Sequence, residues 1–173
     1  MRSVLAFSLM LCLSPAAHAE PLDDLATAQQ NTFDAWVKVP LTEQKVTFIK
    51  EGSPGYGMYD ERGSNVFKLG EPMITYVEPI GYGWKEIPGD MYKMSFSVDV
   101  TVTAENGTVV GGQKNFSEFS FKSHNAAMEC KLDLTMKLTG VPDGKYTLSY
   151  TIHDLSADQT STFDQPIEIV AGS

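Results

Sequence analysis

Two loop segments that combine glycine with aromatic residues are the most suggestive chemical features of this sequence. The first reads Gly55-Tyr56-Gly57-Met58-Tyr59 and the second reads Gly81-Tyr82-Gly83-Trp84. Glycine permits tight turns and a close approach of the backbone to a partner, and aromatic side chains on loops are common interface anchors. If both loops lie at one end of the fold, four of these side chains form a stacking surface. They are Tyr56, Tyr59, Tyr82 and Trp84.

Charged residues close to these aromatics could supply polar contacts to the same partner. They are Arg62, Lys85 and Glu86. The alternative interpretation is that the aromatic side chains fold down as a small core that caps the domain, because long ordered loops must themselves be packed. The sequence leaves both interpretations open.

A second hypothesis is a copper site, because thioether and imidazole ligands suit copper in an exported protein. The residues that could serve are Met91, Met94, His124 and His153. On a strand, however, a spacing of three sends Met91 and Met94 to opposite faces. We therefore expect no resident metal and no cofactor, and we expect Met94 to pack in the core.

Acidic residues raise two further hypotheses. Glu71 and Glu78 could act as the acid and base of a hydrolase that cleaves envelope polymers, provided that they flank one bond. Asp154 and Asp158 could contribute oxygen ligands to calcium, but the glycine and the final glutamate of a calcium-binding loop are missing. No motif for a nucleophilic serine, a zinc protease or a phosphate-binding loop is present, so we predict a protein without catalytic activity.

The first nineteen residues have the pattern of a signal peptide. Arg2 is followed by the apolar run VLAFSLMLCL and then by Ala17-His18-Ala19, a site of the small-x-small type. The apolar run is about half of the roughly 20 residues that a spanning helix needs. We therefore predict residues 1–19 to be a signal peptide and the mature chain to be periplasmic or secreted, without a membrane span.

Charge and cysteine content narrow the classes of partner. The full chain holds 13 Lys and Arg against 22 Asp and Glu, and without Arg2 the net charge becomes −10. An acidic chain with no basic cluster is a poor ligand for nucleic acid or anionic lipid. Once Cys12 has left with the signal peptide, Cys130 has no partner within the chain, and its phase with neighbouring leucines predicts a buried, inert thiol.

The elements that must position these residues are almost all strands. Residues 20–40 read as a short helix or lead-in, with Asp23 and Asp24 in its first turn. From residue 41 apolar and polar residues alternate with period two, which predicts about seven strands. Each strand would have one face toward the core and one toward solvent, which is typical of antiparallel pairing. The predicted strands are 41–50, 73–79, 94–103, 108–121, 129–138, 146–152 and 161–170. Loops fill 52–65 and 80–90, and Asn106-Gly107 predicts a hairpin turn.

One motif sharpens this prediction. Val141-Pro142-Asp143-Gly144-Lys145-Tyr146, between two predicted strands, resembles the tyrosine corner of immunoglobulin-like sandwiches, in which the tyrosine hydroxyl bonds back to nearby backbone. The chain as a whole resembles small exported bacterial proteins with an immunoglobulin-like β-sandwich, although the paired cysteines and buried tryptophan of antibody domains are absent. The resemblance implies an all-β fold, an immunoglobulin-like antiparallel sandwich over residues 41–173.

The sequence therefore predicts a binding or interaction module of the bacterial cell envelope. Its partner would be an envelope protein or a glycan, recognised through the glycine and aromatic loops. The copper carrier and the envelope polymer hydrolase stand as alternatives. Exposed strand edges leave dimerisation open, so the oligomeric state is not predicted.

Overall fold

A computed structural model describes residues 20–171 of the chain, which divides into two compact units with the boundary between Phe33 and Asp34. The predicted signal peptide, residues 1–19, lies outside the described residues, as does Cys12. Within residues 20–171, no helix combines the length and the apolar character needed to cross a membrane.

The predicted lead-in is a helix, α1 (Pro21–Trp36). Proline suits the first helical position, because the N–H that it lacks would have no partner there. The backbone N–H of Asp23 donates to the carbonyl of Glu20 at 2.8 Å, and the acidic side chains of the first turn face the positive end of the helix dipole. No residue of α1 is buried, and Leu22 is 74% exposed.

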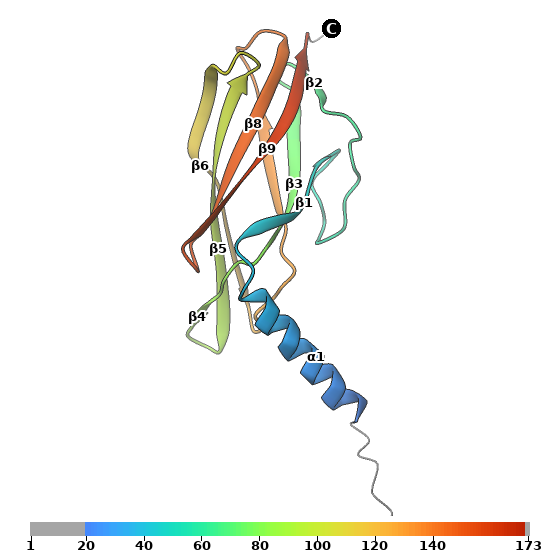
Figure 1. Ribbon diagram of the computed structural model, residues 1–173. Coiled ribbons are helices and arrows are strands. Elements are labelled where there is room, and N and C mark those ends of the chain that lie inside the picture. The colour runs from blue at the N-terminus through green and yellow to red at the C-terminus, as the bar shows by residue number, and fades with distance from the viewer. Residues whose placement is uncertain (1–19, 172–173) are drawn as a thin grey trace, which may run out of the picture. The chain divides into compact units, whose positions relative to one another are not determined.

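Within residues 20–171, nine strands follow α1 (Figure 1). They are β1 (Thr42–Ile49), β2 (Val66–Lys68), β3 (Pro72–Ile80), β4 (Lys85–Ile87), β5 (Met91–Ala104), β6 (Val109–Ser123), β7 (Leu132–Lys137), β8 (Gly144–Asp154) and β9 (Gln159–Val170). The seven longer strands confirm the seven that the alternation predicts. The two short strands were not predicted, because three residues are too few to show a period. β4 lies in the predicted loop 80–90, and β2 lies between the predicted loop 52–65 and the predicted strand 73–79.

The strands form two sheets. A three-stranded sheet has the order β1-β3-β7, and a six-stranded sheet has the order β2-β9-β8-β5-β4, with β6 also paired to β5. All pairs are antiparallel, as predicted, except β2 with β9, which is parallel. At Pro166, which has no N–H to donate, β9 pairs only with β8 among the described residues, because β2 begins to pair at Glu168.

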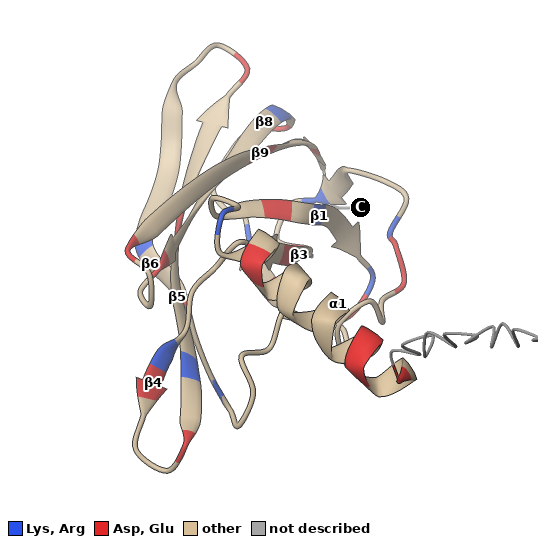
Figure 2. Cartoon of the chain, turned by 60° about the horizontal axis from the view of Figure 1, so that its bottom comes forward, with Lys and Arg blue, Asp and Glu red and all other residues tan. Residues whose placement is uncertain are grey.

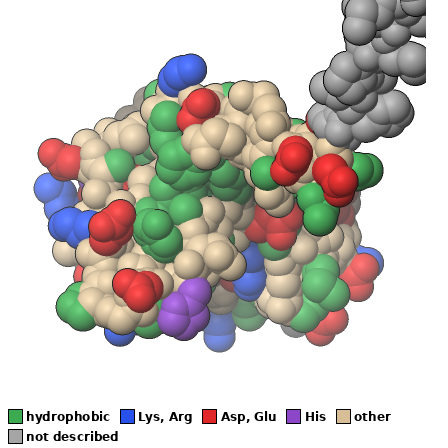
Figure 3. All heavy atoms as spheres, turned by 90° about the horizontal axis from the view of Figure 1, so that it is seen from below, with side chains coloured by type: hydrophobic (Ala, Val, Ile, Leu, Met, Phe, Trp, Pro, Cys, Tyr) green, Lys and Arg blue, Asp and Glu red, His purple; other side chains and the backbone are tan. Residues whose placement is uncertain are grey.

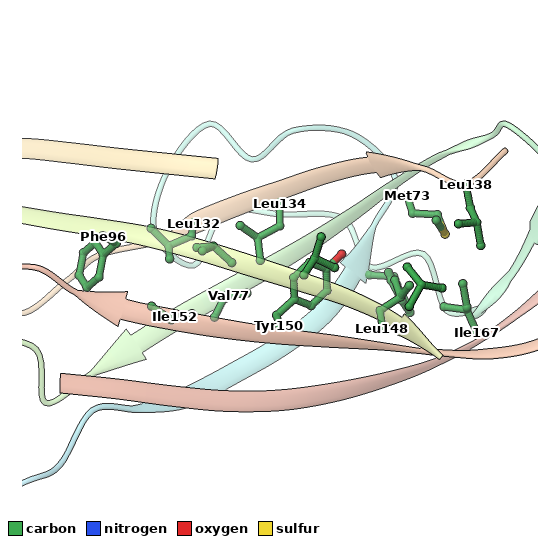
Figure 4. Packing of buried hydrophobic residues seen from close by; sticks show 14 of the residues in the cluster. Met73, Val77, Phe96, Leu132, Leu134, Leu138, Leu148, Tyr150, Ile152 and Ile167 are labelled. Atoms are coloured by element: carbon green, nitrogen blue, oxygen red, sulfur yellow. The ribbon is translucent and has the colours of Figure 1, made fainter. Parts of the chain in front are cut away.

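The two sheets share one hydrophobic core, shown in Figure 4. Alternate residues of β8 point into it, so that Leu148, Tyr150 and Ile152 are fully buried, and Leu132 and Leu134 of β7 meet them from the other sheet. Cys130 belongs to the same cluster, and burial raises the pKa of its thiol to about 12. The prediction that Cys130 is buried is therefore confirmed.

Two turns behave as the sequence predicts. Asn106-Gly107 connects β5 to β6, and Gly107 has a φ of 83° that favours glycine. The hydroxyl of Tyr146 donates to the carbonyl of Pro142 at 2.7 Å, which is the contact that a tyrosine corner requires.

Glu43 of β1 generates a prediction about stability and pH. One of its carboxylate oxygens accepts a hydrogen bond from the Ser161 hydroxyl at 3.0 Å, whereas the other is buried without a hydrogen-bond partner among residues 20–171. Burial raises the pKa of Glu43 above its ordinary value. The protonated form therefore stabilises the folded state at low pH, and this contribution is lost as the pH rises through the raised pKa.

We expect Glu43→Gln to raise the melting temperature at pH 7 and to leave it nearly unchanged below pH ~4, where the carboxyl is protonated in both states. Thermal unfolding followed by circular dichroism across pH 3–8 measures this. Glu61→Gln is the control, because the Lys45 ammonium lowers the pKa of that exposed carboxyl. A Glu43→Gln protein less stable than wild type at pH 7 contradicts the burial argument.

Candidate functional site

The second glycine and aromatic segment forms a cap, which we call the aromatic cap and define as Trp36, Tyr82 and Trp84. The ring centroids of Trp36 lie 5.0 Å from Tyr82 and 5.9 Å from Trp84. The carbonyl of Ala127 accepts hydrogen bonds from the Tyr82 hydroxyl and from the Trp84 indole N–H, both at 2.9 Å. Tyr82 is 1% exposed. Its predicted place on a stacking surface is therefore corrected, because its ring lies in the core and its hydroxyl already has a partner.

The glycines of this segment serve close packing within the chain. A Cβ on Gly81 would come within 2.5 Å of the carbonyl oxygens of Val39 and Pro40, and Gly81 has a φ of 74°. A Cβ on Gly83 would lie 2.6 Å from the Cβ of Ala157. The close backbone approach that glycine permits is thus made to other segments of the same chain.

The first glycine and aromatic segment packs elsewhere, against β3. The ring centroid of Tyr59 lies 4.3 Å from that of Tyr76, whose hydroxyl accepts from the Gly57 N–H at 2.7 Å and donates to Glu78 at 2.7 Å. Burial, with the nearby carboxylates of Glu78 and Glu129, raises the pKa of the half-buried Tyr56. Tyr56 and Tyr59 are thus neighbours of β3 and are not part of the aromatic cap.

The predicted single surface of four aromatic residues is therefore not assembled. Tyr82 is buried in the core, Tyr59 packs on Tyr76, and Tyr56 lies close to Glu78. Arg62, expected to contact a partner, is engaged within the chain. It pairs with Glu71 at 2.7 Å, donates to the carbonyl of Val66 at 2.9 Å and lies 4.3 Å from the ring centroid of Phe67.

The carboxylate pair expected for a hydrolase is also separated. Glu71 lies just before β3 and Glu78 lies near its end. Seven residues of extended chain span about 23 Å, whereas the carboxyl groups of glycosidases lie about 5 to 10 Å apart. These two residues therefore cannot flank one glycosidic bond.

The expected copper ligands do not converge either. Met94 is buried in the core, and His153 of β8 pairs with Asp99 at 3.1 Å. Met91 and His124 line the same surface pocket, but Met94 and His153 are not among its lining residues. Within residues 20–171 no group of three or more histidine, cysteine or acidic side chains is placed to hold a metal ion.

Asp154, considered as a calcium ligand, has a structural role. It is 1% exposed, and its carboxylate accepts hydrogen bonds from three backbone N–H groups. The donors are Gly83 at 2.7 Å, Ser156 at 2.7 Å and Ala157 at 3.2 Å. This carboxylate ties the aromatic segment to the turn between β8 and β9, so its oxygen atoms are already used.

Three lysines lie side by side on the outer face of the six-stranded sheet, and we call them the lysine row. Lys85 of β4 is directly opposite Lys93 of β5, and Lys93 is directly opposite Lys122 of β6. Figure 2 shows the basic positions of β4 and β5 next to each other. Within residues 20–171 no carboxylate forms an ion pair with any of the three.

The lysine row borders a pocket of about 400 Å³. Its lining combines two ammonium groups with hydroxyls, one carboxylate and apolar groups: Lys85, Lys93, Ser95, Phe96, Glu118, Phe119, Ser120, Leu155 and Ser156. The hydroxyl of Ser95 is buried and has no hydrogen-bond partner among the described residues. The pocket therefore offers cationic groups and an unused hydroxyl to a ligand.

The aromatic cap and Asp154 position both walls of this pocket. Trp84 is fixed through its indole N–H, and the next residue, Lys85, begins β4. On the other wall the N–H of Leu155 donates to the carbonyl of Ser95 at 2.9 Å, and the Ser156 hydroxyl donates to the carbonyl of Lys93 at 3.2 Å. Figure 3, which views the molecule from the β4 end, shows hydrophobic side chains gathered at the centre with charged side chains around them.

Sequence reasoning found one member of this site, Lys85, and missed Lys93 and Lys122. The alternation of β5 places Lys93 on the wet face with Ser95, which is a visible signal. The position of Lys122 opposite Lys93 is not visible, because the register between β5 and β6 shifts twice, between Val98 and Val100 and between Val102 and Thr103.

No family model and no curated protein matches the chain. Among solved structures, it is similar to the alkylpurine DNA glycosylase AlkC of Pseudomonas fluorescens bound to DNA containing an abasic site analogue, with a TM-score of 0.40 and 10% identity. It is also similar to a family 123 glycoside hydrolase from Clostridium perfringens, with a TM-score of 0.42 and 10% identity. The matches cover 87% and 76% of this chain but only 39% and 28% of those chains. No function follows from either likeness.

Asp154 yields a prediction about the walls of the pocket. We expect Asp154→Ala to lower the free energy of unfolding by about 3 kcal/mol, because it leaves buried N–H groups without an acceptor. Urea unfolding measures the change. Asp60→Ala, at an exposed carboxylate, is the control and should change stability by less than about 0.5 kcal/mol. Equal stability of the two variants would mean that Asp154 does not hold these segments.

Proposed function

We propose that this protein is an exported binding module, without catalytic activity, that binds an acidic saccharide in the pocket beside the lysine row. The observation that carries the proposal is the lysine row itself, three ammonium groups in cross-strand register without an ion pair among residues 20–171. The export of the chain rests on the signal peptide predicted from residues 1–19.

Like charges directly opposite one another on neighbouring strands destabilise a sheet. This chain has an excess of carboxylates, with 22 Asp and Glu against 13 Lys and Arg, so neutralising partners are plentiful in its composition. The lysine row nevertheless lies beside serine side chains. A ligand carboxylate placed between Lys85 and Lys93 would remove the repulsion, and this gain favours the bound state.

The remaining lining favours a saccharide over a simple anion. Serine hydroxyls from β5, β6 and the β8–β9 turn can donate to and accept from sugar hydroxyls, and Glu118 can accept from them. Leu155, 54% exposed, offers an apolar surface to a sugar ring. Glu118 would repel a ligand of dense negative charge, so the pocket suits one carboxylate among several hydroxyls, as in a uronic acid unit. Of the two partner classes that the sequence predicts, this lining favours the glycan.

The aromatic residues act in this proposal as supports. Tyr82 and Trp84 hold the segment that leads into Lys85, and they do not contact the ligand as stacking anchors. The proposal therefore keeps the second loop of the sequence-based prediction and moves the contact surface from its aromatic side chains to the adjacent sheet face.

We infer that the domain is an immunoglobulin-like sandwich. Support comes from the sheet orders, β1-β3-β7 against β9-β8-β5-β6, and from β2, which pairs with β9 in parallel. The bond from Tyr146 to Pro142 at the start of β8 adds to it. In this interpretation the pocket lies on the outer face of the larger sheet.

The test is calorimetric titration of the exported protein with trigalacturonate and with neutral galactose oligosaccharides of the same length. We expect binding of the acidic oligosaccharide, weakened by salt because the attraction is between charges. Lys93→Gln and Lys85→Gln should each reduce the affinity by at least about tenfold, which corresponds to about 1.4 kcal/mol.

Lys137→Gln is the matched control, because Lys137 is exposed on β7 of the other sheet. It should bind as wild type does. Equal affinity for acidic and neutral oligosaccharides, or unchanged affinity in Lys93→Gln, would refute the proposed site. Circular dichroism of each variant separates loss of binding from loss of fold.

A further inference from the structure

Strand β6 has one open edge. Among the described residues it pairs only with β5, along which it runs in Figure 1, although it is fifteen residues long. An edge of this length has unpaired N–H and C=O groups that can add a further strand. The register with β5 is unbroken from Ser117 to Ser123, so this part of the edge is regular.

The regular part of β6 has a self-complementary sequence. It reads Ser117-Glu118-Phe119-Ser120-Phe121-Lys122-Ser123, and reversal about Ser120 exchanges only the two charges. Phe119 and Phe121 lie opposite Phe96 and Met94, which are buried, and so belong to the core side of the sheet. Glu118, Ser120 and Lys122 lie on the outer side.

We infer that two copies of this chain pair antiparallel through the β6 edge, with Ser120 of each copy opposite Ser120 of the other. In this arrangement Glu118 of each copy lies opposite Lys122 of the other, and Phe119 lies opposite Phe121. Opposite charges and aromatic pairs in directly opposed positions both stabilise a sheet. A two-fold axis makes every such contact occur twice, as in the isologous interfaces of most dimers.

Other registers lack this match. Pairing centred on Glu118 places two carboxylates opposite each other, and pairing centred on Lys122 places two ammonium groups together. Pairing centred on Phe119 sets Glu118 opposite Ser120 and Lys122 opposite Phe116. Pairing centred on Phe121 sets Lys122 opposite Ser120 and Glu118 opposite position 124, beyond the strand. The register centred on Ser120 is therefore the one that pairs both charges and keeps the phenylalanines on one face.

The dimer also gives Lys122 and Glu118 the ion-pair partners that they lack within the described residues of one chain. Lys122 lies opposite Lys93 and has no ion pair within residues 20–171, and Glu118 lies opposite Ser97. Pairing with the second copy gives both residues a partner and reduces the repulsion in the lysine row. Phe119 and Phe121, half-buried and stacked at 6.5 Å, gain cover from the same residues of the other copy. The inference does not depend on the proposed saccharide.

The test is sedimentation of the exported protein over a concentration series. We expect a monomer–dimer equilibrium in which the dimer grows with concentration. Glu118→Lys and Lys122→Glu each replace two attractions with two repulsions, so each should raise the dimer dissociation constant by at least about tenfold. The double variant Glu118→Lys/Lys122→Glu restores complementarity and should dimerise as wild type does.

A mixture of the two single variants is the sharpest readout. Each is expected to be monomeric alone, whereas together they should form a heterodimer, because all four facing charges are then opposite in sign. Lys114→Glu, an equal charge change on β6 beyond the shift in register, is the control and should leave the dimer intact. The inference is overturned by a wild-type protein that stays monomeric at about 1 mM, by dimerisation that survives the single swaps, or by a double variant that is not rescued. The saccharide proposal is tested on the wild-type protein and on variants of Lys85 and Lys93, so the two proposals fail separately.

Discussion

The buried carboxylate of Asp154 is the interaction on which this end of the molecule depends. It is 1% exposed and accepts backbone N–H groups from two segments that are far apart in sequence, at Gly83 and at Ser156 and Ala157. A buried charge is tolerated only when hydrogen bonds replace its hydration. The hydrogen bonds that this carboxylate accepts therefore hold the aromatic segment next to the β8–β9 turn. These segments carry Lys85 on one side and Leu155 and Ser156 on the other, which are the walls of the proposed saccharide pocket.

A second constraint decides which side chains meet on the sheet between those walls. The β5–β6 hairpin begins at Asn106-Gly107, and its register near the turn places Thr103 opposite Val109. Extended without interruption, that register would place Lys93 opposite Phe119. The two shifts along the hairpin instead place Lys122 there. Gly112 lies within this shifted region, where a Cβ would come within 2.9 Å of the Val100 carbonyl. Two local irregularities in the hairpin thus bring Lys122 into register with Lys93.

The strands could be predicted from sequence because each one-sided strand repeats its own signal every two residues. The tyrosine corner and the buried Cys130 could also be predicted, since local spacing defines them. The aromatic residues could not be assigned in the same way. A glycine beside an aromatic residue indicates that the backbone packs closely against another group. The sequence does not show whether that group belongs to a binding partner or to the same chain, and at Gly83 it is Ala157 of the same chain. Lys93 was missed because β4, which carries Lys85 opposite it, lies in a predicted loop. Lys122 was missed because its position opposite Lys93 depends on a register that two shifts conceal.

The two proposals share one architectural cause. The six-stranded sheet is wider than the three-stranded sheet that faces it across the core, and β6 accordingly contains no fully buried residue. A strand in that position gains less from core packing than a central strand such as β8, so its side chains are free to satisfy other requirements. Its outer face carries the charged residues Lys122 and Glu118. Its second edge remains unpaired within the described chain. A strand at the margin of the core can thus carry charged side chains on its outer face, beside the proposed ligand site, and keep an open edge for a second copy, while the core between the sheets stays closed.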